Sequence, residues 1–410
     1  MRICITGGNF YGRGAEAMML IVRDALRERV EGCRLCSAPV RPSQAAAYRE
    51  HGIHPIPIRR RPLPAKAIDV LAYRLGWVRR QSVAFEDIPE QGLRNPFRAS
   101  DAVVDISGFA SGDQWGVRVA RSRWWRFRQA RRTGNKLVFM PPSWGPFGVP
   151  GVRDYTERLL GLADLVFARE PHSWDALKTL QAFDPGRMHL RPDLAFGFRP
   201  SSPDVGGQLL AAVGCDPADG PIIGLTPNMR IYERADGTGG DNAYVSVLAG
   251  VIRHFIEHTE ARILLIPHEV FDYREDDRAL CRIVAEAVGP SERLFTLPGD
   301  ESAADLKAAM GHLSLLVASR YHSLVASLSL RKPVTVIGWS HKYDDLMKAM
   351  RLERWVVDFT RGGPQATVEL AAEAWKEREN IAAAIRERVP DIEAQCRDAL
   401  DLAATCLRQD

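Results

Sequence analysis

The stretch LVASRYHSLVA at residues 316–326 joins an apolar run, a polar turn and a second apolar run. This pattern predicts a strand that ends near Ala318, a turn, and then a helix. The apolar segment from Pro333 to Ile337 predicts the next strand. A strand, a helix and a strand in this order are typical of a parallel sheet covered by helices, so the stretch indicates the α/β class.

The same alternation runs through the whole chain in two series. In the first half, strand-like runs span residues 2–6, 102–106, 136–140, 165–168 and 188–191. After a turn-rich segment from Phe198 to Gly220, further runs span residues 222–225, 262–266, 294–297, 314–318 and 333–337. Two series predict two doubly wound, Rossmann-like domains that face a cleft.

The length and composition of the chain agree with two domains. A chain of 410 residues exceeds the size at which one core stops growing, and its hydrophobic share of 46% is that of a globular protein. We expect an N-terminal domain at 1–200, a linker at 201–219, a C-terminal domain at 220–363 and a helical segment at 364–410.

The start of the chain and its cysteines are typical of a cytoplasmic protein. Residues 1–6 enter a strand pattern without the regions of a signal peptide, and no apolar run approaches the roughly 18 residues that span a bilayer. The seven cysteines are scattered, and Cys33 and Cys36 form a lone CxxC motif. We therefore expect a cytoplasmic location and no zinc.

A glycine-rich turn, GGNFYGRGAE at residues 7–16, lies between the first strand and a helical pattern at 17–30. Its glycines let backbone N–H groups approach a ligand, and the helix start adds a partial positive charge. The turn matches neither GxGxxG nor a Walker A loop. Its candidate ligand contacts are Asn9, Gly12, Arg13 and Gly14, and a plain tight turn is the alternative.

Ligands of open α/β sheets bind beyond the carboxyl ends of strands, so polar residues that follow the runs are candidates. Arg320 and His322 hold such positions, and we expect Ser323 to cap the next helix, whose dipole favours an anion. A surface ion pair of Arg320 and a capping role of His322 are the alternatives.

Other strands are followed by polar residues in the same way. These are Arg169 after the run at 165–168, Asn228 and Arg230 after 222–225, His268 after 262–266, and Lys342 after 333–337. Each has an ordinary alternative: a salt bridge to Glu170 or a place at the domain interface for Arg169, an exposed side chain for Lys342, and a plain loop position for the others.

Positive charge is concentrated in the first third of the chain. Residues 1–132 hold 24 Lys and Arg against 12 Asp and Glu, and RSRWWRFRQARR at 121–132 adds three aromatic residues to six arginines. A solvated helix face, a nucleic-acid surface and a patch for anionic lipid headgroups are the competing hypotheses. Because no recognition helix or RNA-binding motif accompanies the charge, we expect no nucleic-acid partner.

Several segments together resemble the polysaccharide pyruvyl transferase family. They are GRGAEAM at 12–18, PSWGPF at 142–147, ARE at 168–170 with Ser173, PDLAF at 192–196 and SRYHS at 319–323. The resemblance implies transfer of an enolpyruvyl-derived group from phosphoenolpyruvate to a sugar as a ketal, with release of phosphate. It also implies a fold like that of the B-type glycosyltransferases.

The resemblance implies roles for individual residues. Arg320 and His322 take the family's donor-binding Arg-x-His positions, and Arg169 takes an earlier arginine position. The second domain then binds phosphoenolpyruvate, and the first, with Ser143, binds the acceptor. Relatives often carry a glutamine before the turn that contains Ser143, where this chain has prolines.

Ketal formation needs an acid and a base. His322 is the candidate acid, because a histidine changes charge near neutral pH, and Glu16 is the candidate base, with helix-dipole compensation as its alternative. Two arginines and a helix end suffice for the about 4 kcal/mol of a millimolar dissociation constant. The donor carries its own leaving group, so no cofactor is implied, and no carboxylate cluster suggests a metal.

Family members often meet their acceptor as a lipid-linked diphosphate, so the basic segment 121–132 would approach an anionic membrane from its inner face. Two other functions compete with pyruvyl transfer. One is a B-type glycosyltransferase with a nucleotide-sugar donor, since Arg-x-His before a helix also suits a diphosphate. The other is a non-catalytic partner in polysaccharide assembly.

Overall fold

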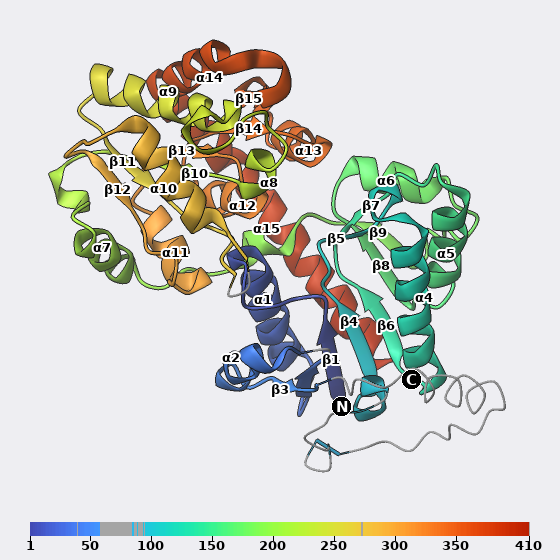
Figure 1. The fold of residues 1–410 in the computed structure, drawn as a ribbon. Coiled ribbons are helices and arrows are strands. Elements are labelled where there is room, and N and C mark those ends of the chain that lie inside the picture. The colour runs from blue at the N-terminus through green and yellow to red at the C-terminus, as the bar shows by residue number, and fades with distance from the viewer. Residues whose placement is uncertain are drawn as a thin grey trace. The chain divides into compact units, whose positions relative to one another are not determined.

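The computed structural model in Figure 1 describes residues 1–38, 40–57, 84, 85, 88, 93, 95–271 and 274–409. The chain forms two compact units, each built from separated segments. Unit 1 comprises Met1–Phe10, Met19–Pro192 and Arg397–Asp410, and unit 2 comprises Tyr11–Met18 and Asp193–Cys396. The helices α1 (Arg13–Arg29) and α15 (Arg378–Arg408) contribute to both units.

Unit 1 is built on a seven-stranded sheet of order β3-β2-β1-β4-β6-β8-β9. Its strands are β1 (Arg2–Thr6), β2 (Arg34–Ser37), β3 (His54–Pro55), β4 (Ala102–Asp105), β6 (Lys136–Phe139), β8 (Leu165–Ala168) and β9 (Met188–Leu190). All neighbours are parallel. The strands predicted from apolar runs are confirmed, whereas β2 and β3 escaped prediction because they are short and partly polar.

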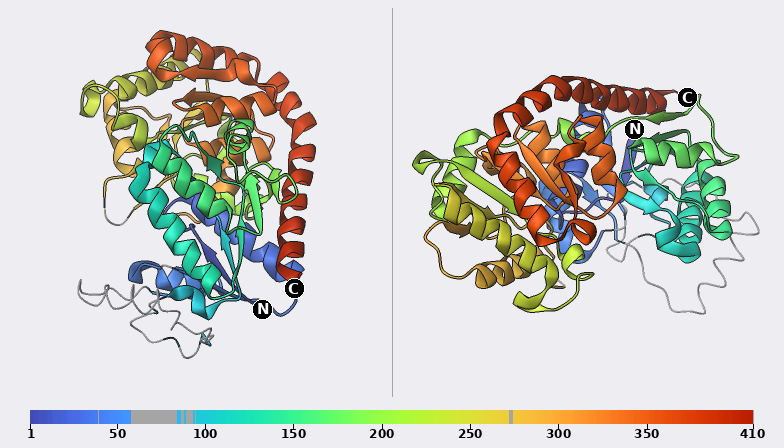
Figure 2. Two further views of the ribbon diagram at one scale, coloured as in Figure 1. Left: turned by 90° about the vertical axis from the view of Figure 1, so that its right-hand side faces the viewer. Right: turned by 90° about the horizontal axis from the view of Figure 1, so that it is seen from above.

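Helices and a small second sheet complete unit 1. The helices are α2 (Ala45–Glu50), α4 (Gly116–Arg132), α5 (Pro150–Leu160) and α6 (Pro171–Lys178), and β5 (Phe109–Ser111) pairs with β7 (Ser143–Trp144). The helices α4 and α5 pack side by side (Figure 2). Phe127 of α4 reaches the core, where its ring centroid lies 4.9 Å from that of Phe139 in β6.

Unit 2 contains a six-stranded parallel sheet of order β12-β11-β10-β13-β14-β15. Its strands are β10 (Ile222–Thr226), β11 (Arg262–Leu265), β12 (Leu294–Thr296), β13 (Leu315–Ala318), β14 (Val334–Gly338) and β15 (Val356–Asp358). The two separate parallel sheets with helical connections confirm the predicted fold class. The half-buried strand β15 was not predicted.

The helices of unit 2 surround this sheet. They are α7 (Pro203–Ala212), α8 (Met229–Tyr232), α9 (Ala243–His258), α10 (Asp277–Val288), α11 (Ala303–Met310), α12 (Tyr321–Ser329), α13 (His341–Ala349) and α14 (Phe359–Lys376). Within the described ranges, none of the helices has the length and apolar character that a membrane span requires.

The segment from Phe198 to Gly220, read from the sequence as turn-rich, contains the helix α7. One of its glycines serves close packing, because a Cβ on Gly206 would lie 2.4 Å from the carbonyl carbon of Ala308 in α11. Lys307, also on α11, holds the start of this segment. Its ammonium group donates to the carbonyl oxygens of Phe198 at 2.5 Å and Ala195 at 3.5 Å.

The buried ammonium group of Lys307 gives unit 2 a testable pH dependence. Burial lowers the pKa of Lys307 from 10.5 to about 8. Between these values the unfolded chain binds a proton that the folded chain has lost, so the free energy of unfolding rises with pH, by up to ~3 kcal/mol. We expect Lys307→Met to flatten this rise in urea unfolding measured from pH 8 to about 10.5. The matched variant of an exposed lysine, Lys348→Met, should keep it; equal slopes for all three proteins would contradict the prediction.

Candidate active site

The loops that follow β10, β11 and β13 meet at one edge of the sheet in unit 2. Asn228, after β10, caps α8 and donates through Nδ2 to the carbonyl oxygen of Ser319 at 2.8 Å. Thr226, at the end of β10, lies 2.8 Å from Ser323 Oγ. The predicted gathering of polar residues beyond the carboxyl ends of these strands is therefore present.

Arg320 is buried at this edge between two carboxylates. Its guanidinium group donates to Asp277, and Nη1 donates to Glu269 Oε2 at 2.5 Å. Burial by itself lowers the pKa of Arg320, but Asp277 and Glu269 outweigh it and raise the pKa above its usual range. The predicted alternative of a surface ion pair is wrong in its location, because the pair is buried.

Asp277 connects Arg320 to the backbone of two other loops. Burial raises the pKa of this carboxyl, an effect that Arg320 opposes. Its oxygens also accept hydrogen bonds from the backbone N–H groups of Met229 at 3.2 Å, His268 at 3.2 Å and Glu269 at 2.8 Å. Arg320 and Asp277 thus fix the three loops to one another.

His322 lies in the first turn of α12, with its side chain 28% exposed. Its Nε2 atom is 3.6 Å from Oδ2 of Asp193, which is almost completely buried. The other carboxylate oxygen of Asp193 accepts from the backbone N–H of Ala195 at 2.9 Å, so the orientation of the carboxylate is fixed. The N-cap position of α12 belongs to Arg320, and the predicted capping alternative for His322 is wrong.

The glycine-rich segment contributes the first turn of α1 to this site. The helix begins at Arg13, earlier than predicted, so Gly14 is helical rather than part of a turn. A Cβ on Gly14 would lie 2.2 Å from Cγ of His322. The absence of a side chain at Gly14 therefore makes room for the imidazole. Gly12 pairs with Glu269 in an isolated antiparallel bridge.

Glu16 is buried, and each of its carboxylate oxygens accepts a hydrogen bond. The donors are Nη1 of Arg13 at 3.0 Å and the backbone N–H of Ala303, the first residue of α11, at 2.9 Å. Arg13 also donates through Nη2 to the carbonyl oxygen of Gly299 at 3.0 Å. This arrangement resembles the helix-dipole alternative rather than a free base, although the helix that Glu16 stabilises is α11.

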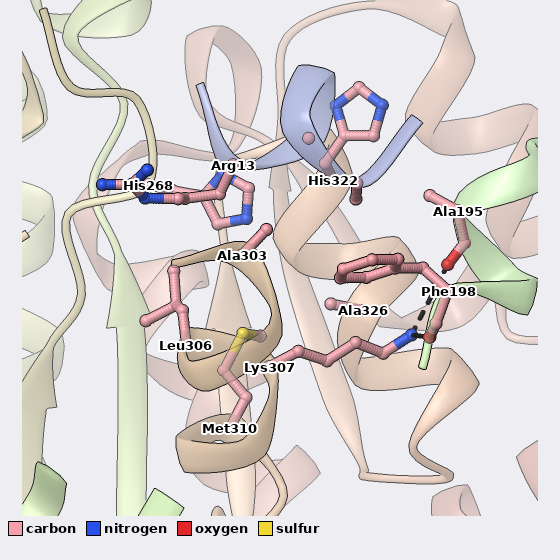
Figure 3. A pocket seen from close by; sticks show the side chains of 12 residues that line it. Arg13, Ala195, Phe198, His268, Ala303, Leu306, Lys307, Met310, His322 and Ala326 are labelled. Carbon is pink, nitrogen blue, oxygen red and sulfur yellow. Dashed lines mark hydrogen bonds between the residues drawn. The ribbon is translucent and has the colours of Figure 1, made fainter. Parts of the chain in front are cut away.

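A pocket in unit 2 brings several of these residues together (Figure 3). It is lined by Arg13, Gly14, Ala17, Ala195, Phe198, His268, Ala303, Leu306, Lys307, Met310, His322 and Ala326. Burial, and then the charges of His322, Arg320 and Arg13, hold the pKa of His268 well below its usual range. His268 is therefore a neutral imidazole, and the cationic side chains that line the pocket are Arg13 and Lys307.

Three other donor candidates of unit 2 have partners of their own. Ser323 does not cap α12 as predicted, because the helix begins at Tyr321 and Ser323 Oγ donates back to the carbonyl oxygen of Arg320 at 2.8 Å. Arg230 forms an ion pair with Glu233 at 2.9 Å. Lys342 is half-buried, with its ammonium group 5.2 to 5.4 Å from three aromatic ring centroids.

The remaining candidates lie in unit 1. Arg169 is buried and donates through Nη2 to Ser143 Oγ at 2.6 Å and through Nε to Glu170 Oε2 at 3.3 Å. The ion pair with Glu170, which was the alternative for Arg169, is therefore present, and Arg169 also donates a hydrogen bond to Ser143. Asn9 lies half-buried in the loop after β1.

Sequence reasoning missed three carboxylates of the site. Asp193 lies in the quoted PDLAF segment but received no role, and Glu269 directly follows the candidate His268. Asp277 had no signal beyond its place at the start of a helical pattern. In the part of the chain that the structure describes, no group of three His, Cys, Asp or Glu side chains is placed to hold a metal ion.

Solved structures with similar folds are nucleotide-sugar enzymes and related proteins. The UDP-GlcNAc 2-epimerase of Neisseria meningitidis, bound to UDP-GlcNAc, has a TM-score of 0.61 and 10% identity, with 100% of both chains covered. HepE from Anabaena, in complex with UDP-glucose, has a TM-score of 0.58 and 13% identity, with 99% of this chain and 98% of HepE covered. At these identities the likeness concerns the fold, and it agrees with the predicted B-type glycosyltransferase architecture.

A family model for polysaccharide pyruvyl transferase matches residues 13–341. The matched range includes the first turn of α1, Asp193, and the three loops that meet at Arg320. Because the match covers most of the sequence, the chain belongs to the polysaccharide pyruvyl transferase family.

Proposed function

We propose that the chain transfers an enolpyruvyl-derived group from phosphoenolpyruvate to a sugar of a polysaccharide or of its lipid-linked precursor. The product is a pyruvate ketal, and phosphate is released. One observation supports this above the others: His322 lies at a pocket with its imidazole between the buried carboxylate of Asp193 and the bare Cα of Gly14. The arrangement suits a positioned acid, and family membership supplies the reaction.

The donor is anionic, and unit 2 offers donors for an anion where two helices begin. The first turns of α1 and α12 are in contact through Gly14 and His322, so the positive ends of the two helix dipoles lie close together. Each helix end contributes about 0.3 to 1 kcal/mol, and hydrogen bonds from charged groups contribute about 1.5 to 3 kcal/mol each. Arg13 and protonated His322, together with the two helix ends, reach the about 4 kcal/mol of a millimolar dissociation constant.

This assignment changes the part played by Arg320. Its amino groups are bound to Asp277 and Glu269, so its first effect is to hold the loop that carries His322. A direct bond from Arg320 to the donor would have to replace the Glu269 contact, which is the more exposed of the two. We therefore assign Arg320 mainly to positioning and His322 to donor contact. Arg13 lines the pocket, and it would reach the donor by exchanging its bond to the Gly299 carbonyl oxygen or to Glu16.

The reaction needs one proton at the methylene carbon of the donor and one on the departing phosphate, and the two attacking sugar hydroxyls supply both. Protonation turns the methylene into a methyl group, the first hydroxyl adds at the neighbouring carbon, phosphate leaves, and the second hydroxyl closes the ketal. His322 carries a proton between these groups. The nearby charge of Asp193 favours the protonated imidazole, and positioned proton transfer contributes about 10² to 10⁴ in rate.

Phosphate release from phosphoenolpyruvate tests the proposal directly. With a panel of free and lipid-linked glycosides, we expect acceptor-dependent release from the wild type and a loss of at least about 10² in rate for His322→Ala. His258→Ala removes an exposed histidine from the end of α9 and should leave the rate unchanged. If no acceptor supports release and a UDP-sugar raises the melting temperature while phosphoenolpyruvate does not, the chain is a glycosyltransferase. If neither donor raises it, the non-catalytic alternative holds.

The pH dependence of the rate tests the role of Asp193. Asp193→Asn keeps the acceptor for Ala195 N–H but removes the negative charge near His322, so the imidazole should lose its proton at lower pH. The rate should then fall at lower pH than in the wild type, with activity retained in mild acid. A merely structural role would instead lower the rate by the same factor at every pH, and that result would remove Asp193 from the mechanism.

The contact between Gly14 and His322 is tested by adding one methyl group. Gly14→Ala should displace the imidazole and lower the rate at least about tenfold, even though alanine favours helices. Gly12→Ala is the matched control, because its Cβ would meet the Glu269 side chain at ordinary distances, 3.4 Å from Cγ and 3.9 Å from Oε1. Equal rates in the two variants would show that the position of the ring does not depend on Gly14.

A further inference from the structure

Unit 1 presents an exposed apolar surface around the start of α4. Of the five large hydrophobic side chains that are exposed among the described residues, four lie here: Trp115 at 47%, Val117 at 40%, Val119 at 38% and Val149 at 40%. Single exposed apolar side chains are common, but a local group of them marks a surface that contacts something apolar.

Contacts within unit 1 join these side chains into one patch. Both carboxylate oxygens of Asp113, just before α4, accept backbone N–H groups at the start of α5, from Gly148 at 2.7 Å and Val149 at 3.1 Å. A Cβ on Gly151 would lie 3.0 Å from Val117. The beginnings of α4 and α5 are therefore adjacent. We call the exposed side chains at this place, Trp115, Val117, Arg118, Arg121 and Val149, the α4 patch; Val119 lies on another side of the helix.

The patch also carries unneutralised positive charge. Arg118 and Arg121 are exposed, and neither forms an ion pair within the described part of the chain. Asp113 is the only acidic residue from 113 to 132, and its oxygens are taken by backbone N–H groups. The surface is hollowed beside these arginines, between Ser122 and the indoles of Trp124 and Trp125.

The arginines farther along α4 differ from these two. Arg123 is buried and bound to Asp105 at 2.8 Å and to Ser107 Oγ at 3.2 Å, and Arg131 pairs with Asp164 at 2.7 Å. The guanidinium of Arg128 lies 5.1 Å from the ring centroid of Trp124. The segment 121–132 is therefore not one cationic face, and its charge available for binding is concentrated toward the start of the helix.

We infer that the α4 patch docks onto an anionic phospholipid bilayer. Exposed aliphatic side chains and a tryptophan fit the boundary between headgroups and acyl chains, while Arg118 and Arg121 fit the headgroup phosphates. The hollow beside them offers guanidinium N–H groups and the Ser122 hydroxyl as donors to a phosphate. A bilayer matches both chemistries on one surface.

Two other occupants fit less well. A symmetric contact with a second copy would bring Arg118 and Arg121 of each copy toward one another, because the same patch is used twice. Single-stranded nucleic acid needs open aromatic faces, but guanidinium groups of Arg128 and Arg158 lie 5.1 and 5.8 Å from the ring centroid of Trp124. The valines of the patch offer nothing to a nucleic acid.

The inference is independent of the proposed reaction, since vesicle binding needs no donor or acceptor. Full-length protein should sediment with vesicles that contain phosphatidylglycerol and much less with pure phosphatidylcholine. Arg118→Gln combined with Arg121→Gln should weaken binding about 30-fold, because each arginine near an anionic surface contributes about a fivefold factor. Arg386→Gln with Arg397→Gln removes two exposed arginines from α15 and should bind as the wild type does.

A second variant tests the apolar half of the patch. Trp115→Ser with Val117→Ser keeps the charge, so we expect weaker vesicle binding, and what remains should be lost at high salt, where the electrostatic part is screened. Equal vesicle binding by the wild type and both patch variants would overturn the inference. So would a patch-dependent dimer in sedimentation, or patch-dependent binding of single-stranded RNA, without vesicle binding.

Discussion

The arrangement of unit 2 depends on the buried ion pair between Arg320 and Asp277. Arg320 follows β13, Asp277 begins α10, and Asp277 also accepts N–H groups from the loops after β10 and β11. A buried pair of this kind costs much of its Coulomb energy in desolvation, but removing one partner typically costs about 3 to 5 kcal/mol, because the other is left buried and charged. The pair therefore adds little to stability and much to the specificity of one loop arrangement.

The contact between Gly14 and His322 adds a second constraint to the one that the Arg320–Asp277 ion pair imposes. Once the loop after β13 is fixed, His322 projects from the first turn of α12 toward the first turn of α1, and only a residue without a side chain fits opposite it. In α1 this residue is Gly14, whose weak helix propensity costs about 1 kcal/mol relative to alanine. The glycine-rich segment 7–16 therefore serves the contact with His322 as well as the turn before α1.

The sequence predicted the strands well and the partners of the site residues poorly, for a physical reason. Apolar runs report burial in a parallel sheet, so β1, β10 and β13 could be placed within a residue or two. The partner of Arg320 is 43 positions away on another loop, and only the folded sheet brings the two together. Helix starts were also missed where tertiary contacts define them, as at Arg13, where the backbone N–H donates to the carbonyl oxygen of His268 at 3.2 Å. The prediction that Ser323 caps α12 was wrong for the same reason.

The charges around the pocket suggest how donor binding and acid catalysis are coupled. Arg13 faces Glu16, Arg320 faces Asp277 and Glu269, and His322 faces Asp193, while His268 is held neutral. These four carboxylates already offset the two arginines, Lys307 and a protonated His322, so the pocket has no surplus positive charge to offer a donor with a phosphate and a carboxylate. The two helix starts supply part of the attraction for the donor. The negative charges of the donor also favour a proton on His322, which supplies the rest of the attraction. By linkage, an anionic donor would bind more tightly to the protonated imidazole and would bring the acid into its active form as it binds.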